Sequence, residues 1–323
     1  MTPYQTITYA LSTALNHYQE TMGEAFPTKP ELDDINDPEF GAVAEMVGDV
    51  FTIRVSTGTL AATQRLWRDA KATEVMASLN ATGEELTHVS LVWLMLHEMH
   101  HYEMEHFQIV DRAYLTETFG AHQFAIAKRA KVTESPAFKH IPPEDRHKVE
   151  PCLEMQADHD AIEMVIDAYS PDEWPSLRAR AAAISAMMML IEREDAKHDQ
   201  EHSSHPKAAT RIFQLLRYLT QMPTIQLMVA RQHAELGIEP HIPSEEEVLA
   251  YTAEVLVPCF YDAVALARTG NATTIASDLG DQESFFKDVE ATLHELPKPS
   301  WVAATRGAGQ WVTLMEVNGK LKQ

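Results

Sequence analysis

Three residues with acid–base and metal-binding chemistry, His97, Glu98 and His101, form the pattern H-E-x-x-H. On an α-helix each residue turns about 100°, so the two histidines lie about 40° apart and one turn apart along the axis. Two imidazoles on one helix face can bind a single zinc ion, and the glutamate reaches a metal-activated water without being a ligand. The alternative is a helix with ordinary core or solvated histidines. The apolar run 92–96 before the motif favours a buried position, where uncompensated histidine and glutamate would be costly.

A third ligand is expected from a second helix, because a catalytic zinc takes three protein ligands and leaves one position open. Glu154 and Asp158 lie one helical turn apart, and Ala157 and Ala161 on the same face would let their helix approach the motif helix closely. Glu154 could then ligate the metal, while Asp158 accepts a hydrogen bond from the far nitrogen of a ligand histidine. The alternative is a solvated acidic face in an acidic protein.

A third group of residues follows farther along the chain. His205 stands immediately before Pro206, and a proline in this position is well suited to open a helix. The imidazole could turn toward the metal, and Arg211 could pair with buried carboxylates. The alternatives are an ordinary surface cap or a histidine-rich surface loop that also contains His198 and His202.

The composition favours helices, because glycine is scarce, at 12 of 323 residues, and apolar residues recur three or four positions apart. Capping and proline signals predict helices over residues 82–110, 151–169, 206–219 and 244–268. Alternating residues predict a strand over 51–56, Asn318-Gly319 predicts a hairpin turn, and prolines predict a loop over 131–150.

These signals together predict a mainly α fold with a small β element, in which the motif helix packs on a second helix that carries the third ligand. We expect one catalytic domain over residues 1–270, with its motif core at 83–220, and a C-terminal appendage over 271–323. The strand at 51–56 could offer an edge to an extended peptide, or it could be a buried structural strand.

Charge and composition exclude several classes of protein. The chain carries 26 Lys and Arg against 48 Asp and Glu, a formal net charge of −22, which disfavours nucleic acid and anionic membranes as partners. The longest apolar stretch, Ala181–Ile191, is too short to span a bilayer. With two cysteines, Cys152 and Cys259, and no secretory signal, we expect a cytoplasmic protein without membrane insertion.

In order and spacing, the three groups resemble the family that holds the CAAX prenyl proteases and the HtpX-like zinc metallopeptidases (gluzincins), as a soluble member. That family pairs H-E-x-x-H with a later E-x-x-A-D and an H-P…R segment, which here span residues 83–220. A further histidine often follows the motif, as His106 does here. One departure is His100, where the family usually has a small residue, so that its ring could crowd or rival the site.

The resemblance implies a zincin-like fold and a role for each matching residue. It implies one Zn²⁺ per chain bound by His97, His101 and Glu154, with Glu98 as general base. It also implies that Asp158 supports a ligand histidine from behind and that His205 is an oxyanion donor.

We therefore predict a zinc metalloendopeptidase that hydrolyses a protein or peptide substrate by zinc-activated water, with Glu98 as general base. His205 is the first choice for the additional oxyanion donor, and Tyr102, Tyr114 and Tyr218 are alternatives. Two other functions remain open: an inactive, metal-binding regulatory protein with the same fold, and a di-iron carboxylate oxidoreductase. The di-iron site would use Glu98-x-x-His101 and Glu103-x-x-His106, although both lie on one predicted helix. The oligomeric state does not follow from the sequence.

Overall fold

The computed structural model describes residues 1–70, 74–110, 114–115, 141–197, 205–235, 241–269, 272–298 and 300–321. The first half contains α1 (Pro3–Met22), β1 (Glu31–Ile35), β2 (Ala42–Val47), β3 (Val50–Ser56), α2 (Thr57–Ala70), α3 (Glu74–Leu79), α4 (Gly83–Glu103), α5 (His106–Val110) and β4 (Tyr114–Leu115). The second half contains α6 (Val149–Ile166), α7 (Trp174–Asp195), α8 (Ala208–Glu235), α9 (Glu245–Tyr251), α10 (Val257–Thr269), α11 (Thr273–Leu279), α12 (Gln282–Thr292) and α13 (Arg306–Leu321). The predicted mainly α fold with a small β element is confirmed.

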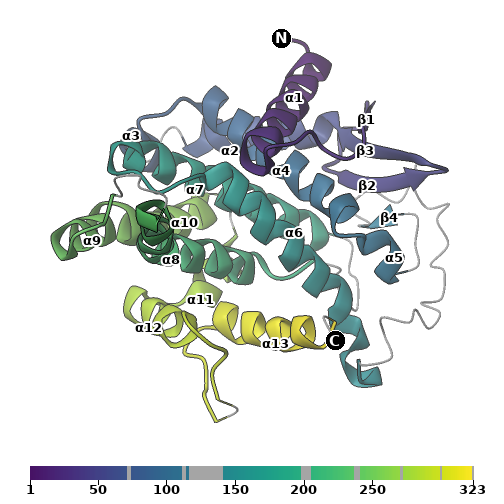
Figure 1. Cartoon of the computed structure of the whole chain (residues 1–323). Coiled ribbons are helices and arrows are strands. Elements are labelled where there is room, and N and C mark those ends of the chain that lie inside the picture. Colours follow the sequence, from purple (N-terminus) through teal and green to yellow (C-terminus); the bar gives the residue numbers. More distant parts are fainter. Residues whose placement is uncertain are drawn as a thin grey trace.

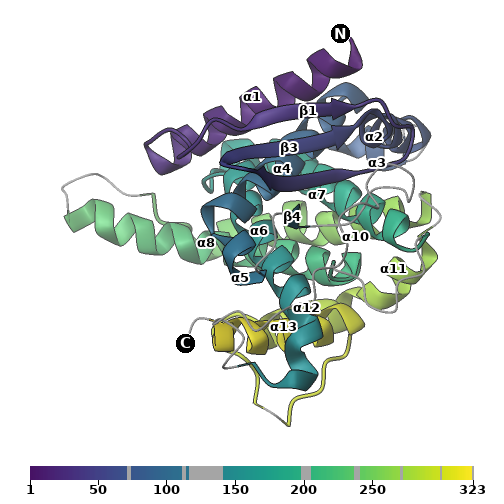
Figure 2. The same ribbon diagram turned by 90° about the vertical axis from the view of Figure 1, so that its right-hand side faces the viewer.

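The strands form one small sheet in the order β1-β3-β2-β4. β3 pairs with β1 in parallel and with β2 in antiparallel fashion, so both of its edges are occupied. The predicted strand at 51–56 is therefore confirmed as a buried structural strand, and the idea that it offers an edge to a peptide is wrong. Figures 1 and 2 show the sheet beside α1 and α4 on one side of the helical body, with α13 on the other side.

Helix α4 begins where its cap predicts. The Thr82 side chain accepts a hydrogen bond from the Glu85 backbone N–H, and the Glu85 carboxylate accepts one from the Thr82 N–H. The helix ends at Glu103, before the predicted end at Val110, because Glu105 adopts a left-handed conformation with φ of 56°, which interrupts a right-handed helix. The chain then turns, and α5 starts at His106.

The other predicted helices exist with shifted ends. α6 starts before Pro151, and it stops at Ile166 because Asp167 has a positive φ. α8 starts at Ala208 and continues through Pro223 to Glu235, although a proline removes one intrahelical hydrogen bond. The helix predicted over 244–268 exists as α9, a π-helical turn (Thr252–Leu256) and α10.

Part of the predicted loop over 131–150 lies outside the described residues. In its described part, Pro143–Lys148 forms a 3₁₀ helix that leads into α6. His198 and His202 also lie outside the described residues, as does the side chain of Tyr114.

The continuous segment Glu245–Thr269 is long and apolar enough to cross a membrane by length and hydropathy, and it alone passes this test among the described helices. In the structure α10 packs against α7, where the Asp262 carboxylate accepts two hydrogen bonds from Arg178. These contacts resemble those of a core helix in a folded domain.

The C-terminal segment packs directly on the helices of the motif core. α13 lies against α8 and α6, and the Trp311 indole donates a hydrogen bond to Gln214 of α8. Asn318 and Gly319 lie inside α13, so the predicted hairpin turn is wrong: a turn signal needs a partner strand, and helical packing decides here. The predicted boundary at 270 stays a prediction.

The closest approach of α13 to α8 gives a test of this packing. A Cβ atom at Gly307 would lie 2.7 Å from the Ala209 carbonyl oxygen, whereas one at Gly309 would meet Ala303 at an ordinary 3.6 Å. We expect Gly307→Ala to lower the free energy of unfolding by about 1–3 kcal/mol through overpacking. Gly309→Ala, the matched control, should raise it by up to about 1 kcal/mol. Urea denaturation followed by circular dichroism measures both, and equal stabilisation of the two variants would contradict the close packing.

Candidate metal centre

Two imidazoles and one carboxylate converge in the interior. His97 Nε2 lies 3.2 Å from His101 Nε2 and 3.1 Å from Glu154 Oε2, and His101 Nε2 lies 3.4 Å from Glu154 Oε1. All three side chains are at least 97 % buried. These are the three residues that the sequence analysis predicts as ligands, and the structure brings them together as a group that could hold a metal ion.

The size of this donor triangle can be compared with that of a tetrahedral zinc site. Tetrahedral ligands at the zinc–nitrogen distance of about 2.0–2.1 Å are about 3.3–3.4 Å apart. The three donor–donor distances, 3.1, 3.2 and 3.4 Å, are close to that edge length. Two histidine nitrogens and one carboxylate oxygen are the three protein ligands of one class of catalytic zinc site.

The triangle forms because α4 and α6 pack side by side. His97 and His101 are one turn apart on α4, and the i, i+4 spacing places them on the same face. On α6, Ala157 and Ala161 are fully buried, and small side chains allow the two helices to approach. Glu154 of α6 then reaches both imidazoles.

Asp158 and Arg211 support His97 from behind. His97 Nδ1 lies 3.0 Å from Asp158 Oδ1, which can accept the Nδ1 proton and leave Nε2 to face the triangle. Arg211 Nε donates to Asp158 Oδ2 over 2.7 Å, and its Nη2 donates to Oδ1. The guanidinium also lies over the Trp93 ring, 5.4 Å from its centre.

Glu98 lies beside strand β2 of the sheet. Its carboxylate is buried, and the backbone of Ala44 in β2 hydrogen-bonds to it. Among the described residues, Oε2 of Glu98 has no hydrogen-bond partner, which is unusual for a buried carboxylate and is one of the features that a catalytic role would explain. Burial raises the pKa of Glu98 to about 7, and the nearby Glu154 adds to the rise. This places its proton affinity in the range of a general base.

His205 enters the site from the connection between α7 and α8. Its Nε2 lies 3.5 Å from Glu154 Oε2, and its Nδ1 lies 2.9 Å from Asp195 Oδ2 at the end of α7. Sequence analysis missed Asp195. Its position in the charged C-terminal turn of α7 is a weak signal, because acidic residues are abundant in this chain.

Opposed effects set the pKa values of the cluster. Burial disfavours the charged form of His97, but Asp158 and Glu154 outweigh it and raise its pKa to about 10. Burial lowers the pKa of His101 well below its usual range, although the charge of Glu154 acts to raise it. Burial would raise the pKa of Glu154, yet the three surrounding histidines hold it well below its usual value. The cluster thus keeps an ionised carboxylate among imidazoles.

The remaining candidates lie outside the triangle. His100 Nδ1 contacts Glu103 at 2.7 Å, and Glu103 also accepts a hydrogen bond from Tyr18. His100 therefore does not crowd the site as the sequence suggested. Tyr102 packs on Phe51 in an aromatic group near the sheet, and Tyr218 packs on His159.

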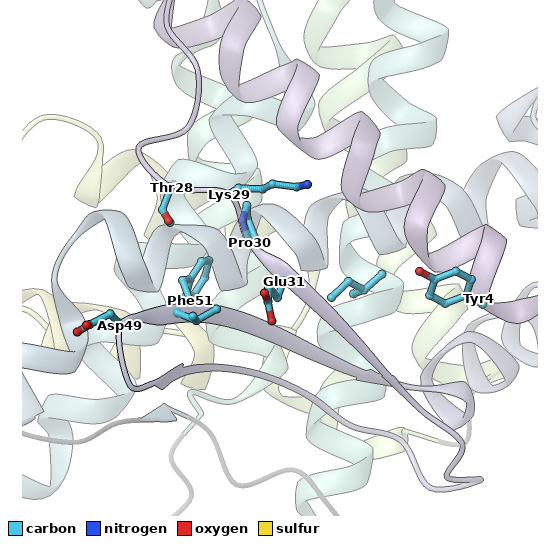
Figure 3. A pocket seen from close by; sticks show the side chains of 9 residues that line it. Tyr4, Thr28, Lys29, Pro30, Glu31, Asp49 and Phe51 are labelled. Atoms are coloured by element: carbon cyan, nitrogen blue, oxygen red, sulfur yellow. The ribbon is translucent and has the colours of Figure 1, made fainter.

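Two other features of the surface lie apart from these residues. An open pocket of about 540 Å³ lies between α1 and the strands β1 and β3 (Figure 3). It is lined by Tyr4, Thr28, Lys29, Pro30, Glu31, Leu32, Asp49, Val50 and Phe51. None of the candidate site residues lines it. His159, Asp160 and Glu163 on α6 also lie within reach of one another, but two of the three are exposed and water competes with any ion there.

We compared the sequence with models of known protein families. The sequence model of the peptidase U49 family matches residues 7–228, which is more than half of the 323 residues. The chain belongs to the peptidase U49 family. No curated protein and no solved structure matches the sequence significantly.

The U49 match runs from α1 into α8 and includes every residue of the candidate metal centre. The helices α9 to α13 follow it. Membership supports the predicted peptidase class at the level of the family.

The pair of Asp158 and Arg211 provides a test of the centre's electrostatics. Both side chains are fully buried, so Arg211→Met should leave an uncompensated carboxylate and lower the free energy of unfolding by about 3–5 kcal/mol. Arg306→Met removes an arginine that is 83 % exposed and pairs with Asp278, and it should change stability by less than about 0.5 kcal/mol. Chemical denaturation of both variants measures the contrast, and a neutral Arg211→Met would contradict it.

Proposed function

We propose that this U49 chain is a zinc metalloendopeptidase that binds one Zn²⁺ through His97, His101 and Glu154. The observation that carries the proposal is the buried donor triangle, whose edges match those of tetrahedral zinc ligands. Zinc bound there supplies Lewis acidity that activates water and polarises the scissile carbonyl. The finer kinship with CAAX prenyl proteases and HtpX-like gluzincins is part of this proposal, supported by the convergence of all three motif segments on one site.

Glu98 is the general base in this proposal. It follows His97 directly, so its carboxylate lies beside the triangle without contributing an edge to it. The unpartnered Oε2 is available to take a proton from the attacking water and to deliver it to the leaving amine.

His205 is the proposed oxyanion donor, and Asp195 holds it in position. The contact between Nδ1 and Asp195 orients the ring, and the other nitrogen then faces the triangle beside Glu154. The Asp195 carboxylate also favours the protonated imidazole, which is the form that donates a hydrogen bond to developing negative charge.

The substrate class in this proposal is a protein or peptide. The net charge of −22 supports a soluble protein that binds neither nucleic acid nor anionic membranes. A cytoplasmic location is proposed on the same ground and on the presence of two buried free cysteines.

The alternatives receive less support. For the di-iron reading, the carboxylate of Glu103 would have to join Glu98 at a shared metal pair, but it is turned toward Tyr18 and His100. The inactive binding protein is the second candidate, and it differs from the peptidase only in whether Glu98 performs chemistry.

The metal content of the protein and the activity of the Glu98→Gln variant distinguish the zinc peptidase, the inactive binding protein and the di-iron protein. We expect about one zinc per purified chain, the same content in Glu98→Gln, and loss of zinc in His97→Ala. Glu98→Gln should slow hydrolysis by at least about 10²-fold, because it removes the base and leaves the ligands in place. Elemental analysis measures the metal, and proteomic detection of new N-termini in a lysate treated with either protein measures cleavage. About two irons per chain would overturn the zinc proposal. If the parent and Glu98→Gln produced the same new N-termini, the peptidase proposal would be wrong and only metal binding would remain.

The oxyanion donor is tested at His205. His205→Asn should keep zinc and reduce kcat by about 10²–10³-fold, the usual effect of losing one such donor. Asp195→Asn should cause a smaller loss and lower the apparent pKa of the acidic group in the pH–rate profile, because the imidazolium loses its carboxylate partner. Tyr102→Phe and Tyr218→Phe serve as controls for the two alternative donors. If a tyrosine variant lost activity and His205→Asn did not, the donor assignment would be wrong.

A further inference from the structure

We propose that His106, Gln156 and Asn318 form a hydrogen-bonded chain that fixes the tautomer of His101 and so directs its Nε2 lone pair at the metal. The inference rests on the proposed zinc function and assigns these three as positioning residues. It gives the C-terminal helix α13 a part in the metal centre, although residue 318 lies beyond the segment that matches the U49 family.

The first link joins two imidazoles. His101 Nδ1 lies 2.9 Å from His106 Nδ1, and both side chains are fully buried. At this distance one nitrogen must carry a proton and the other must present a lone pair. The left-handed residue Glu105 ends α4 and lets the chain turn, so that the His106 ring faces His101.

The second link decides which nitrogen carries the proton. Gln156 Nε2 donates to Asn318 Oδ1 over 2.6 Å, and this turns Gln156 Oε1 toward His106 Nε2 at 3.0 Å. A carbonyl oxygen only accepts hydrogen bonds, so His106 Nε2 carries a proton. Neutral His106 then presents a lone pair at Nδ1.

The consequence for His101 follows from the same reasoning. Its Nδ1 must donate to His106, which leaves Nε2 as an unprotonated lone pair that faces His97 and Glu154. Behind His97, the Asp158 carboxylate lies 3.0 Å from Nδ1 and can accept its proton. Both ligand histidines thus have a proton acceptor behind Nδ1, which is the usual support of a metal-binding imidazole.

Helix α13 is held firmly enough to act as the end of this chain. The Gln310 side chain accepts hydrogen bonds from the Lys207 N–H and the Thr210 hydroxyl, and Lys320 forms an ion pair with Asp145. Gly307 permits close contact with Ala209. These contacts lie at both ends of α13 and set the position of Asn318.

The test measures zinc affinity of the full chain by competition with a chelator. His106→Leu should weaken zinc binding about 10–100-fold, the usual cost of losing such support. Asn318→Leu, at a half-buried site that should tolerate leucine, should weaken it about 3–10-fold because Gln156 is then free to rotate. Asn318→Asp keeps the acceptor oxygen and should stay within about twofold of the parent. Thr313→Val, on the same helix and outside the chain of hydrogen bonds, is the control.

A second readout reports the tautomers directly. In ¹⁵N-histidine-labelled, zinc-loaded protein, NMR should show His101 protonated at Nδ1 and His106 protonated at Nε2, with the His106 signals assigned from their loss in His106→Leu. The proposal is overturned if Asn318→Leu binds zinc like the parent, or if His106 is protonated at Nδ1. A parent chain that binds no zinc would instead refute the proposed function.

Discussion

The close packing of α4 on α6 is the constraint on which the rest of the structure depends. It places a carboxylate of one helix within 3.4 Å of two imidazoles of the other, in an interior closed to solvent. Ionised groups in such a place are unfavourable unless each has a partner. The Arg211 guanidinium supplies the compensating charge behind Asp158, and the histidines compensate Glu154. The surrounding helices therefore have to hold several side chains in register, and a core made of apolar side chains alone would not require this.

Different elements around this helix pair position different side chains of the site. The sheet approaches through β2, whose backbone at Ala44 hydrogen-bonds to the Glu98 carboxylate, while α7 and its connection to α8 supply the Asp195–His205 pair. Each group comes from a segment anchored by its own packing, which is how an active site keeps side chains at fixed distances. The match to the peptidase U49 family covers all of these residues.

The C-terminal helices add a feature beyond the part of the chain that the family model matches. α13 contacts the start of α8 through Gln310 and the middle of α6 through Asn318. It therefore contacts α6, which carries Gln156 and Asp158, and α8, which carries Arg211. In this chain the buried cluster of His97, His101 and Glu154 and the C-terminal segment belong to one packed structure.

The amino-acid sequence by itself determined the local part of this site. The i, i+4 spacing of His97 and His101, the position of Glu98 and the caps of α4 depend only on helix geometry over a few residues, and the mainly helical class follows from composition and periodicity. Tertiary structure alone decided which distant groups complete the site. Asp195 behind His205, the turn at Glu105 that returns His106, and the reach of Asn318 to Gln156 all depend on how helices far apart in sequence pack. The same packing placed β3 in the middle of its sheet and made residues 318–319 helical. No local pattern encodes such contacts, because they arise from the shapes of surfaces that exist only after the chain has folded.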